Sequence, residues 1–384
     1  ASDVYKRQIM GIGTNLLGYA NKKIDKAIKK IVDKSNMSTF YCPEEVLLAE
    51  KLVQLHPWSS SVRFARTGGE ANAIAVRIAR ASTGRDKVAI CGYHGWHDWY
   101  LACNINSSQN LEEHLLPGLE PNGVPKSLEG TTIPFRFNDL DQIKEIIKNN
   151  ELAAVKMEVQ RSVEPQKGYL ETISQLCREN GIVLIFDECT SGFRETFGGI
   201  HLKYNLEPDL SILGKALGNG YAITAIVGKS EIMDSVQSTF MSSTFWTERI
   251  GPTAALKTLE IMEKEKSWEY VTNLGKYIQD SWYKIAKRYA LPIKISGIPA
   301  LSVFSLQLDS WLKYKTFISQ EMLKKGILAS DKIYLCTSHN KKNMDRYLNE
   351  LDNIFAQIKK HEDNSSIDEF LDGPICSSGF SRLN

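Results

Sequence analysis

The segment between residues 151 and 187 constrains the possible folds most strongly. It contains ELAAVKMEV (151–159), YLETISQLCREN (169–180) and IVLIFD (182–187), a pattern that predicts a strand, an amphipathic helix and a second strand. The second strand is wholly apolar until Asp187, as expected of a strand that is covered on both faces. Such strands form parallel sheets between layers of helices, and ligands bind beyond their carboxyl ends. We therefore predict an α/β protein with a ligand site near Asp187.

A lysine lies inside another apolar run, SILGKALGNG (211–220). A charged ammonium group that is buried without a partner costs several kcal/mol, so Lys215 must reach water at a strand end or lose its proton. A neutral lysine amine is a nucleophile. The run alone leaves a structural and a catalytic interpretation open, and the surrounding motifs must distinguish them.

A glycine pair precedes a helical pattern in TGGEANAIAVRIARAST (67–83). The apolar residues recur at helical spacing, which predicts an amphipathic helix that begins at Gly68 and Gly69. Glycines let a ligand approach the exposed N–H groups of a helix N-terminus, and the helix dipole favours anions there. The pattern is compatible with a phosphate site and also with a turn that only begins a helix.

An aromatic loop, CGYHGWHDWY (91–100), follows the predicted strand KVAI (87–90). Its rings can pack on the core, or Tyr93 can stack on a planar cofactor. His94 and His97 have no third histidine, cysteine or carboxylate nearby at the spacing of a zinc site. We therefore predict that no metal is bound.

Together and in this order, the motifs resemble the class III aminotransferases, which depend on pyridoxal 5'-phosphate (PLP). The resemblance rests on the glycine-started helix, YHG, FDECTSGFR (186–194), the lysine of SILGKALGNG and SSTFWTERIG (242–251), and it covers roughly residues 10 to 355. Within the class, GVP, GGIHLKYNLEPDLSILGKALGNGY and GILAS look similar to glutamate-1-semialdehyde 2,1-aminomutase and to related aminotransferases of cell-surface sugar pathways.

The resemblance implies fold type I of the PLP-dependent transferases, as in aspartate aminotransferase. This fold has a large domain with a mostly parallel seven-stranded sheet and a smaller α/β carboxyl-terminal domain. The chain begins with ASDVYKRQIM, which has neither an initiator methionine nor an apolar signal core, and we expect a truncated amino terminus. The expected parts are an amino-terminal segment (1–55), a large PLP-binding domain (56–260), a small domain (261–360) and a tail (361–384).

The same resemblance implies roles for individual residues. Lys215 would attach to the cofactor aldehyde and later move protons, and Asp187 would keep the cofactor ring nitrogen protonated. The other implied cofactor contacts are Gly68 and Gly69 at the phosphate, Tyr93 and Cys189 on the two ring faces, His94 and Glu158 around the site, and Thr244 at the phosphate of a neighbouring subunit. Relatives often have serine or threonine at position 69, so Gly69 should leave one phosphate bond to backbone groups.

The candidates for binding the substrate are Arg161, Arg194 and Trp246. Arg161 and Arg194 follow the strands that end near Glu158 and Asp187, and arginine is the usual partner of a carboxylate. Trp246 and Glu248 stand where small residues are common in the mutases, which should reshape the entrance of the pocket.

We expect a homodimer that moves an amino group from an amino acid such as glutamate to a carbonyl acceptor, with a keto sugar as one candidate. Glutamate-1-semialdehyde 2,1-aminomutase is the alternative, and a PLP-dependent decarboxylase or racemase is a further one. The mutases carry a glutamate in the segment that corresponds to residues 332–339, and this chain has none between Lys332 and His339. This difference favours amino transfer between two molecules over the mutase reaction.

Charge and cysteine content limit the other partners. Lys and Arg number 47 against 45 Asp and Glu, and their mixture along the chain argues against binding to nucleic acid or to an anionic membrane. The seven cysteines are scattered and odd in number, as is typical of reduced thiols in the cytoplasm. The expected ligands are therefore small molecules.

Overall fold

The computed structural model of the chain describes residues 8–107, 109–112, 114, 117–364 and 366–378. These residues form two compact units. The larger unit holds residues 22–264, and the smaller unit holds residues 8–21 together with 265–378. This grouping differs from the predicted boundary at residue 55, because α2 (Pro43–Leu55) packs on the first strand of the larger unit.

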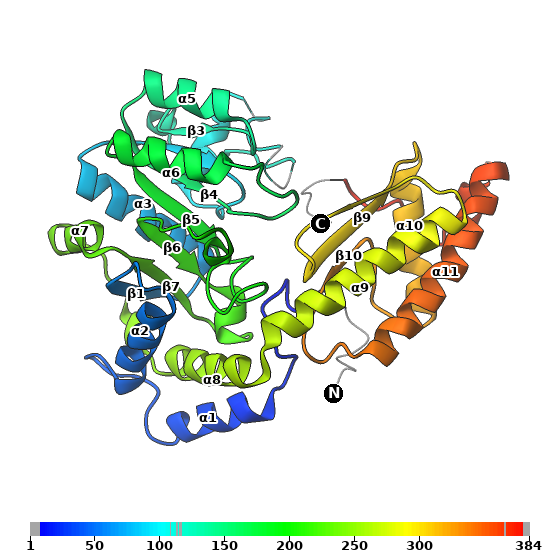
Figure 1. Cartoon of the computed structure of the whole chain (residues 1–384), viewed down its shortest axis with the longest axis horizontal. Coiled ribbons are helices and arrows are strands. Elements are labelled where there is room, and N and C mark those ends of the chain that lie inside the picture. The colour runs from blue at the N-terminus through cyan, green and yellow to red at the C-terminus, as the bar shows by residue number, and fades with distance from the viewer. Residues whose placement is uncertain (1–7, 108, 113, 115–116, 365, 379–384) are drawn as a thin grey trace. The chain divides into compact units, whose positions relative to one another are not determined.

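A seven-stranded sheet forms the centre of the larger unit (Figure 1). Its strands are β1 (Ser61–Ala65), β2 (Lys87–Cys91), β3 (Thr132–Pro134), β4 (Leu152–Met157), β5 (Val183–Glu188), β6 (Leu210–Leu213) and β7 (Thr224–Gly228). The spatial order is β1-β7-β6-β5-β4-β2-β3, and only β7 runs antiparallel to its neighbours. The prediction of a mostly parallel seven-stranded sheet is confirmed.

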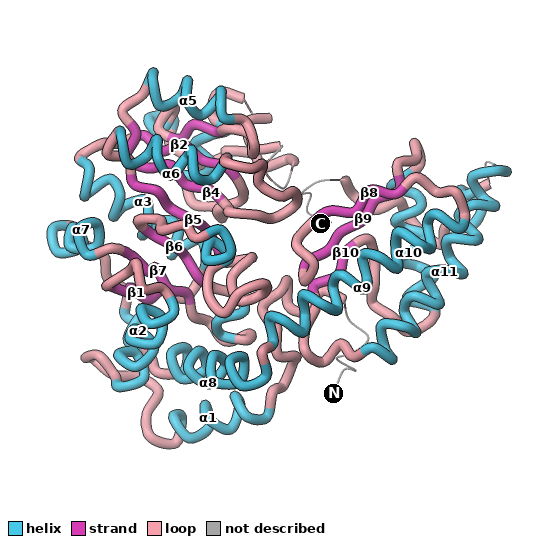
Figure 2. The backbone as a smooth tube through the Cα atoms, in the orientation of Figure 1, coloured by secondary structure: helices cyan, strands magenta, loops and turns pink. Residues whose placement is uncertain are grey.

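Helices cover this sheet, as a sheet buried on both faces requires: α2, α3 (Gly68–Thr83) and α6 (Tyr169–Glu179) contact its strands. The other described α-helices in this part of the chain are α1 (Lys22–Val32), α4 (Asp98–Leu101), α5 (Leu140–Asn149), α7 (Ser230–Met233) and α8 (Ile250–Glu265). The apolar face of α3 joins side chains of β2, β4, β5, β6 and β7 in one buried cluster. Helices α5 and α6 lie side by side, and α6 contacts β5 (Figures 1 and 2).

The smaller unit is built on a three-stranded antiparallel sheet of order β10-β9-β8. Its elements are β8 (Ile293–Ser296), β9 (Leu301–Leu306), β10 (Lys332–Tyr334), α9 (Ser267–Arg288), α10 (Trp311–Lys324) and α11 (Lys341–Asn364). Residues 8–21 belong to this unit, and the N–H of Tyr334 donates to the carbonyl of Gln8 at 2.7 Å. Residues 366–378 belong here too, and the N–H of Asp372 donates to Gln320 Oε1 at 2.7 Å.

Helices α8 and α9 follow one another with a single residue between them, because α8 ends at Glu265 and α9 begins at Ser267. Lys266 between them has a φ of 47°, in the left-handed region that ends a right-handed helix. No glycine or proline marks this break, so the sequence carries no local sign of it. Among the described helices, none is long and apolar enough to cross a membrane.

Candidate active site

The carboxyl ends of four adjacent strands carry the predicted site residues. Asp187 lies at the end of β5, Lys215 follows β6, Glu158 follows β4 and Tyr93 follows β2. Because these strands are parallel neighbours, their ends meet at one edge of the sheet. Residues that are far apart in the sequence therefore share one region of the fold.

Asp187 is a buried carboxylate with three neighbours. Its Oδ2 accepts a hydrogen bond from His94 Nδ1 at 2.8 Å, and its Oδ1 accepts one from the N–H of Cys189 at 3.2 Å. Lys156 Nζ lies 3.9 Å from Oδ2. Burial by itself raises the pKa of Asp187, but Lys156 and His94 outweigh burial and hold that pKa well below its usual value. Asp187 is therefore ionised at neutral pH.

His94 is neutral and orients Asp187. Burial, and then the charge of Lys156, lower the pKa of His94 to about 4. A neutral ring donates from one nitrogen only, so the bond to Asp187 assigns the proton to Nδ1. His94 is thus bonded directly to the carboxylate at the end of β5.

Glu188, the residue that follows Asp187 in β5, points to the opposite face of the sheet. Glu188 accepts hydrogen bonds from the N–H of His201 at 2.8 Å and from His201 Nδ1 at 2.9 Å. Trp58 Nε1 donates to the other ring nitrogen of His201 at 2.9 Å. Successive side chains of a strand point to opposite faces, so Asp187 alone of the two acids can serve the site.

Lys215 has a partner and a lowered pKa. Its Nζ donates to Thr190 Oγ1 at 3.0 Å. Burial, followed by the charges of Arg161 and Arg194, lowers the pKa of Lys215 to about 8. Its φ of 39° lies in the left-handed region, which costs a non-glycine residue roughly 1 kcal/mol. The backbone thus holds a lysine where glycine is favoured, and a substantial fraction of its amine is neutral near pH 8.

Helix α3 begins at Gly68, as expected. Thr67 caps the helix by accepting the N–H of Glu70 at 3.3 Å, and the N–H groups of Gly68 and Gly69 have no partner within the helix because they lie in its first turn. A Cβ atom on Gly69 would stand 2.9 Å from the ring of His97. A Cβ atom on Gly95, whose φ is 107°, would stand 3.0 Å from Gly69 Cα. The aromatic loop therefore packs against this helix start, and His97 occupies the space that a serine at position 69 would need.

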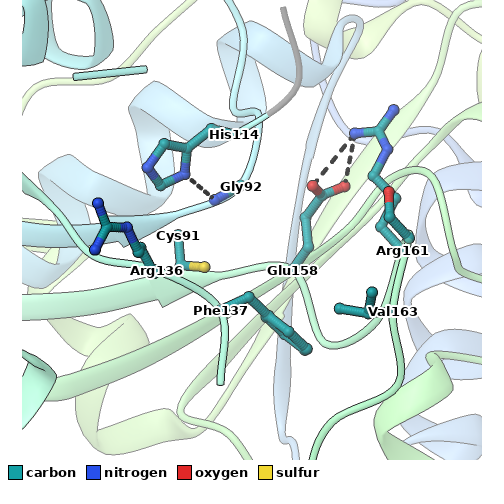
Figure 3. Close-up of a pocket in the computed structure, with 9 residues that line it drawn as sticks. Cys91, Gly92, His114, Arg136, Phe137, Glu158, Arg161 and Val163 are labelled. Atoms are coloured by element: carbon teal, nitrogen blue, oxygen red, sulfur yellow. Dashed lines mark hydrogen bonds and ion pairs between the residues drawn. The ribbon is translucent and has the colours of Figure 1, made fainter. Parts of the chain in front are cut away.

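Glu158, Arg161 and Gly92 line a cavity of about 370 Å³. Figure 3 draws its lining residues. Arg161 Nη1 donates to both oxygens of Glu158, at 3.0 and 3.2 Å. Burial raises the pKa of Glu158 despite Arg161, and a Glu158 oxygen accepts the N–H of Tyr93 at 3.3 Å. His114 Nδ1 accepts the N–H of Gly92 at 2.8 Å. Glu158 therefore holds both Arg161 and the start of the aromatic loop.

A second arginine in this cavity was missed by the sequence interpretation. Arg136 follows β3 and lines the cavity with Arg161 and His114 (Figure 3). Its only signal in the sequence is its place after a short strand, and the strand order that brings β3 next to β2 is not visible there. The cavity thus presents two guanidinium groups.

Arg194 lies inside the protein. Its side chain has no exposed surface, and its Nε donates to the carbonyl of Thr190 at 2.6 Å. From this position it acts on Lys215 through its charge. Direct contact between Arg194 and a substrate stays a prediction.

The segment SSTFWTERIG lies at the beginning of α3. Trp246 Nε1 donates to Glu70 Oε1 at 2.7 Å, and the guanidinium of Arg63 lies 5.2 Å from the Trp246 ring centre. Glu248 accepts the N–H groups of Ile250 and Gly251, each at 2.8 Å. Glu248 thus caps α8, and its effect on a pocket entrance stays a prediction. Thr244 is exposed, and its contact with a neighbouring subunit stays a prediction.

These features fit PLP. The buried anion Asp187 suits a protonated ring nitrogen, Lys215 offers an amine, and the α3 start offers N–H groups to a phosphate. Cys189 lies beside the start of α3, because a Cβ atom on Gly68 would stand 3.5 Å from its Sγ, and burial followed by the charge of Asp187 raises the pKa of its thiol. Contact of Tyr93 and Cys189 with the two ring faces stays a prediction. The fold and the site together define a PLP-dependent transferase of fold type I.

Comparison with known proteins identifies the family. The profile of the class III aminotransferases matches residues 5–345, so the chain belongs to this family of PLP-dependent enzymes. It is 31% identical over 366 residues to a 3-aminobutyryl-CoA aminotransferase of Cloacimonas acidaminovorans (strain Evry), covering 91% of this chain and 84% of the relative. It is 29% identical over 377 residues to a glutamate-1-semialdehyde 2,1-aminomutase of Methanocaldococcus jannaschii, covering 91% and 87%.

Solved structures confirm the fold. The FumI protein of Sphingopyxis sp. MTA144, solved in its PLP internal aldimine form, superposes with a TM-score of 0.83 at 23% identity, covering 92% of this chain and 84% of that one. An omega-transaminase from Sphaerobacter thermophilus gives a TM-score of 0.81 at 21% identity, covering 91% and 86%. At identities below 25%, this similarity establishes the fold alone.

Proposed function

We propose that this enzyme transfers an amino group between two molecules, from an acidic amino acid to a separate carbonyl compound. The proposal rests mainly on one observation: an ionised, buried Asp187 and the amine of Lys215 lie at the ends of adjacent parallel strands. PLP supplies an aldehyde that exchanges amino groups and a ring that accepts electrons. The remaining chemistry belongs to side chains of this chain.

Three side chains and two backbone N–H groups have distinct roles in the proposed reaction. Lys215 Nζ moves the proton between the two carbon atoms that gain and lose it, and its lowered pKa suits it to accept a proton near neutral pH. Asp187 holds the proton on the ring nitrogen, and His94 fixes the orientation of Asp187. The N–H groups of Gly68 and Gly69 bind the phosphate.

The cavity beside Glu158 supports an acidic substrate. Arg161 already binds one carboxylate, that of Glu158, with a single nitrogen. Arg136 adds a second positive charge to the same cavity. Arginine binds carboxylates through two parallel hydrogen bonds, a geometry that lysine cannot reproduce.

Replacing Arg161 with lysine should raise the KM for an acidic amino donor about tenfold, the loss expected of roughly 1.4 kcal/mol of charge-assisted bonding. The KM for a neutral donor such as alanine should change little. Steady-state kinetics with both donors measure the difference, and the exposed Arg178→Lys serves as the matched control. Equal changes in KM for both donors would show that Arg161 does not bind the side-chain carboxylate of the acidic donor.

Amino transfer between two molecules is favoured over the mutase reaction by Trp246. Its large ring is tied to the start of α3, where the mutases commonly have a small residue. A mutase must retain its intermediate until the nitrogen returns to the adjacent carbon, which needs a pocket closed around one short substrate. The absence of a glutamate between Lys332 and His339 points the same way.

Two incubations of the holoenzyme test the function. With glutamate as donor and a panel of carbonyl acceptors, including 2-oxo acids, acyl-CoA thioesters with a 3-oxo group and keto sugars, we expect stoichiometric 2-oxoglutarate and one aminated acceptor. With glutamate-1-semialdehyde as the sole substrate, we expect little 5-aminolevulinate. Efficient 5-aminolevulinate formation would establish the mutase instead, and carbon dioxide release or inversion of the donor would establish a decarboxylase or racemase.

We also propose that the enzyme is a homodimer in the cytoplasm. Two segments of the chain carry aromatic side chains that are 65% to 84% exposed, namely Phe40 with Tyr41 and Phe240 with Phe245. Their two segments are adjacent, because the N–H of Arg249 donates to the carbonyl of Asn36 at 2.8 Å. A second copy of the chain would cover this surface and bring Thr244 to the other site. Sedimentation of the holoenzyme at the mass of two chains would support the homodimer.

The cytoplasmic location rests on the cysteines. All seven have free thiols, which suits a reducing compartment.

A further inference from the structure

Lys156 is a fully buried lysine to which the proposed amino transfer has so far assigned no role. It lies in β4 with no exposed surface, and its Nζ has no hydrogen-bond partner among the described residues. The atom lies 3.9 Å from Oδ2 of Asp187. A lysine amine is almost never fully buried unless it is paired, so this position needs a physical reason.

The register of the sheet explains how Lys156 reaches Asp187. Lys156 pairs with Ile185 across the parallel strands β4 and β5, and paired residues of neighbouring strands point to the same face. Asp187 is two residues beyond Ile185 and therefore shares that face. Ala154 and Ile185 belong to the apolar cluster under α3. The side chain of Lys156 therefore lies next to apolar residues, and its ammonium group lies beside the carboxylate of Asp187.

Two groups therefore share one oxygen of Asp187. His94 Nδ1 donates to Oδ2 at 2.8 Å, and Lys156 Nζ lies 3.9 Å from the same atom. A protonated ring nitrogen of PLP would add a second positive charge at this carboxylate. A single negative charge cannot fully stabilise two buried positive charges, so the ring nitrogen and Lys156 compete for it.

We propose that Lys156 is a positioning residue whose buried ammonium group holds Asp187 ionised and sets how strongly Asp187 retains the proton on the PLP ring nitrogen. This inference rests on the proposed role of Asp187. The ionisable groups that act on the cluster are His94, Asp187, Glu158, Cys189 and, through His94, His114. Burial lowers the pKa of Lys156, and Asp187 opposes that change.

The first test uses the enzyme without PLP. The pKa of His94 is about 4, lowered by burial and then by Lys156, so His94 should show no protonation above about pH 5 in nuclear magnetic resonance of ring-labelled histidines. In Lys156→Met, one positive charge is gone while Asp187 remains, and His94 should titrate above pH 5. An unchanged His94 curve in Lys156→Met would overturn the proposal. His94→Gln assigns the signal.

Two further variants keep this test decisive. Met157→Leu alters the adjacent buried residue of β4, whose side chain points to the other face, and should leave the His94 curve unchanged. If Lys156→Met does not fold, the double variant Lys156→Met/Asp187→Asn removes both charges together, which buried pairs tolerate better. Its His94 should then titrate at higher pH than in Asp187→Asn alone, and equal curves would overturn the proposal.

The second test uses PLP labelled with nitrogen-15 at the ring nitrogen. The ring should keep its proton to higher pH in Lys156→Met than in the unaltered holoenzyme, because the competing charge is gone. An identical pH dependence would show that Lys156 does not act on the ring. A ring that is unprotonated in the unaltered enzyme and insensitive to Asp187→Asn would instead refute the proposed role of Asp187, whatever the His94 titration shows.

Discussion

Replacing Lys215 with alanine should abolish covalent attachment of PLP and slow amino transfer by about 10⁴-fold, the upper range for proton transfer by a positioned side chain. The reason is that the amine both anchors the cofactor and carries the proton in the proposed reaction. Borohydride reduction followed by peptide mass spectrometry measures the attachment, and exposed Lys167→Ala serves as the control. A reduced PLP adduct on another lysine of the variant would move the nucleophile away from Lys215.

The pH dependence of PLP capture gives an independent check on Lys215. Burial disfavours the ammonium form, so the pKa is lowered to about 8 and the neutral amine is lost as the pH falls through that value. The rate of PLP capture by the cofactor-free enzyme should therefore rise with pH up to about 8 and then level off. A rise that continues to pH 10 would show an ordinary, exposed lysine.

Replacing Asp187 with asparagine should lower kcat by about 10³-fold or more while PLP still binds through its phosphate and Lys215. An amide cannot stabilise a positive charge on the ring nitrogen, so the ring becomes a poor electron acceptor. The same change leaves Lys156 without a counter-charge, and the variant should also unfold at lower temperature. Steady-state kinetics, PLP titration and thermal unfolding measure the three effects.

Asp209→Asn is the matched control for Asp187→Asn. Asp209 lies just before β6, where it accepts the N–H of Leu184 at 2.8 Å and pairs with Lys229 at 2.9 Å. Its loss should lower stability and leave kcat nearly unchanged, because the residue lies at the opposite end of the sheet. Near-normal activity in Asp187→Asn would remove Asp187 from the chemistry.

The sequence determined those features that depend on residues close together in the chain. The apolar strand ending in Asp187, the helix beginning at Gly68 and the lysine of SILGKALGNG are local patterns, and local patterns predict strands, helices and their ends. Parallel strands then place their carboxyl ends at one edge, so the neighbourhood of Asp187 and Lys215 follows from the pattern as well. This is why the α/β fold could be predicted before any coordinates, whereas the family was predicted from the resemblance of the motifs.

Only the tertiary structure decided the features that depend on register and on contacts across the chain. Lys156 stands in an ordinary-looking strand, and it meets Asp187 because β4 and β5 pair Lys156 with Ile185. Arg136 enters the cavity because β3 lies beside β2. Glu248 caps α8, and His97 fills the space beside Gly69, because those segments fold back on one another. No local pattern encodes such pairings, since each depends on the free energy of packing the whole unit rather than on the conformation of a few neighbouring residues.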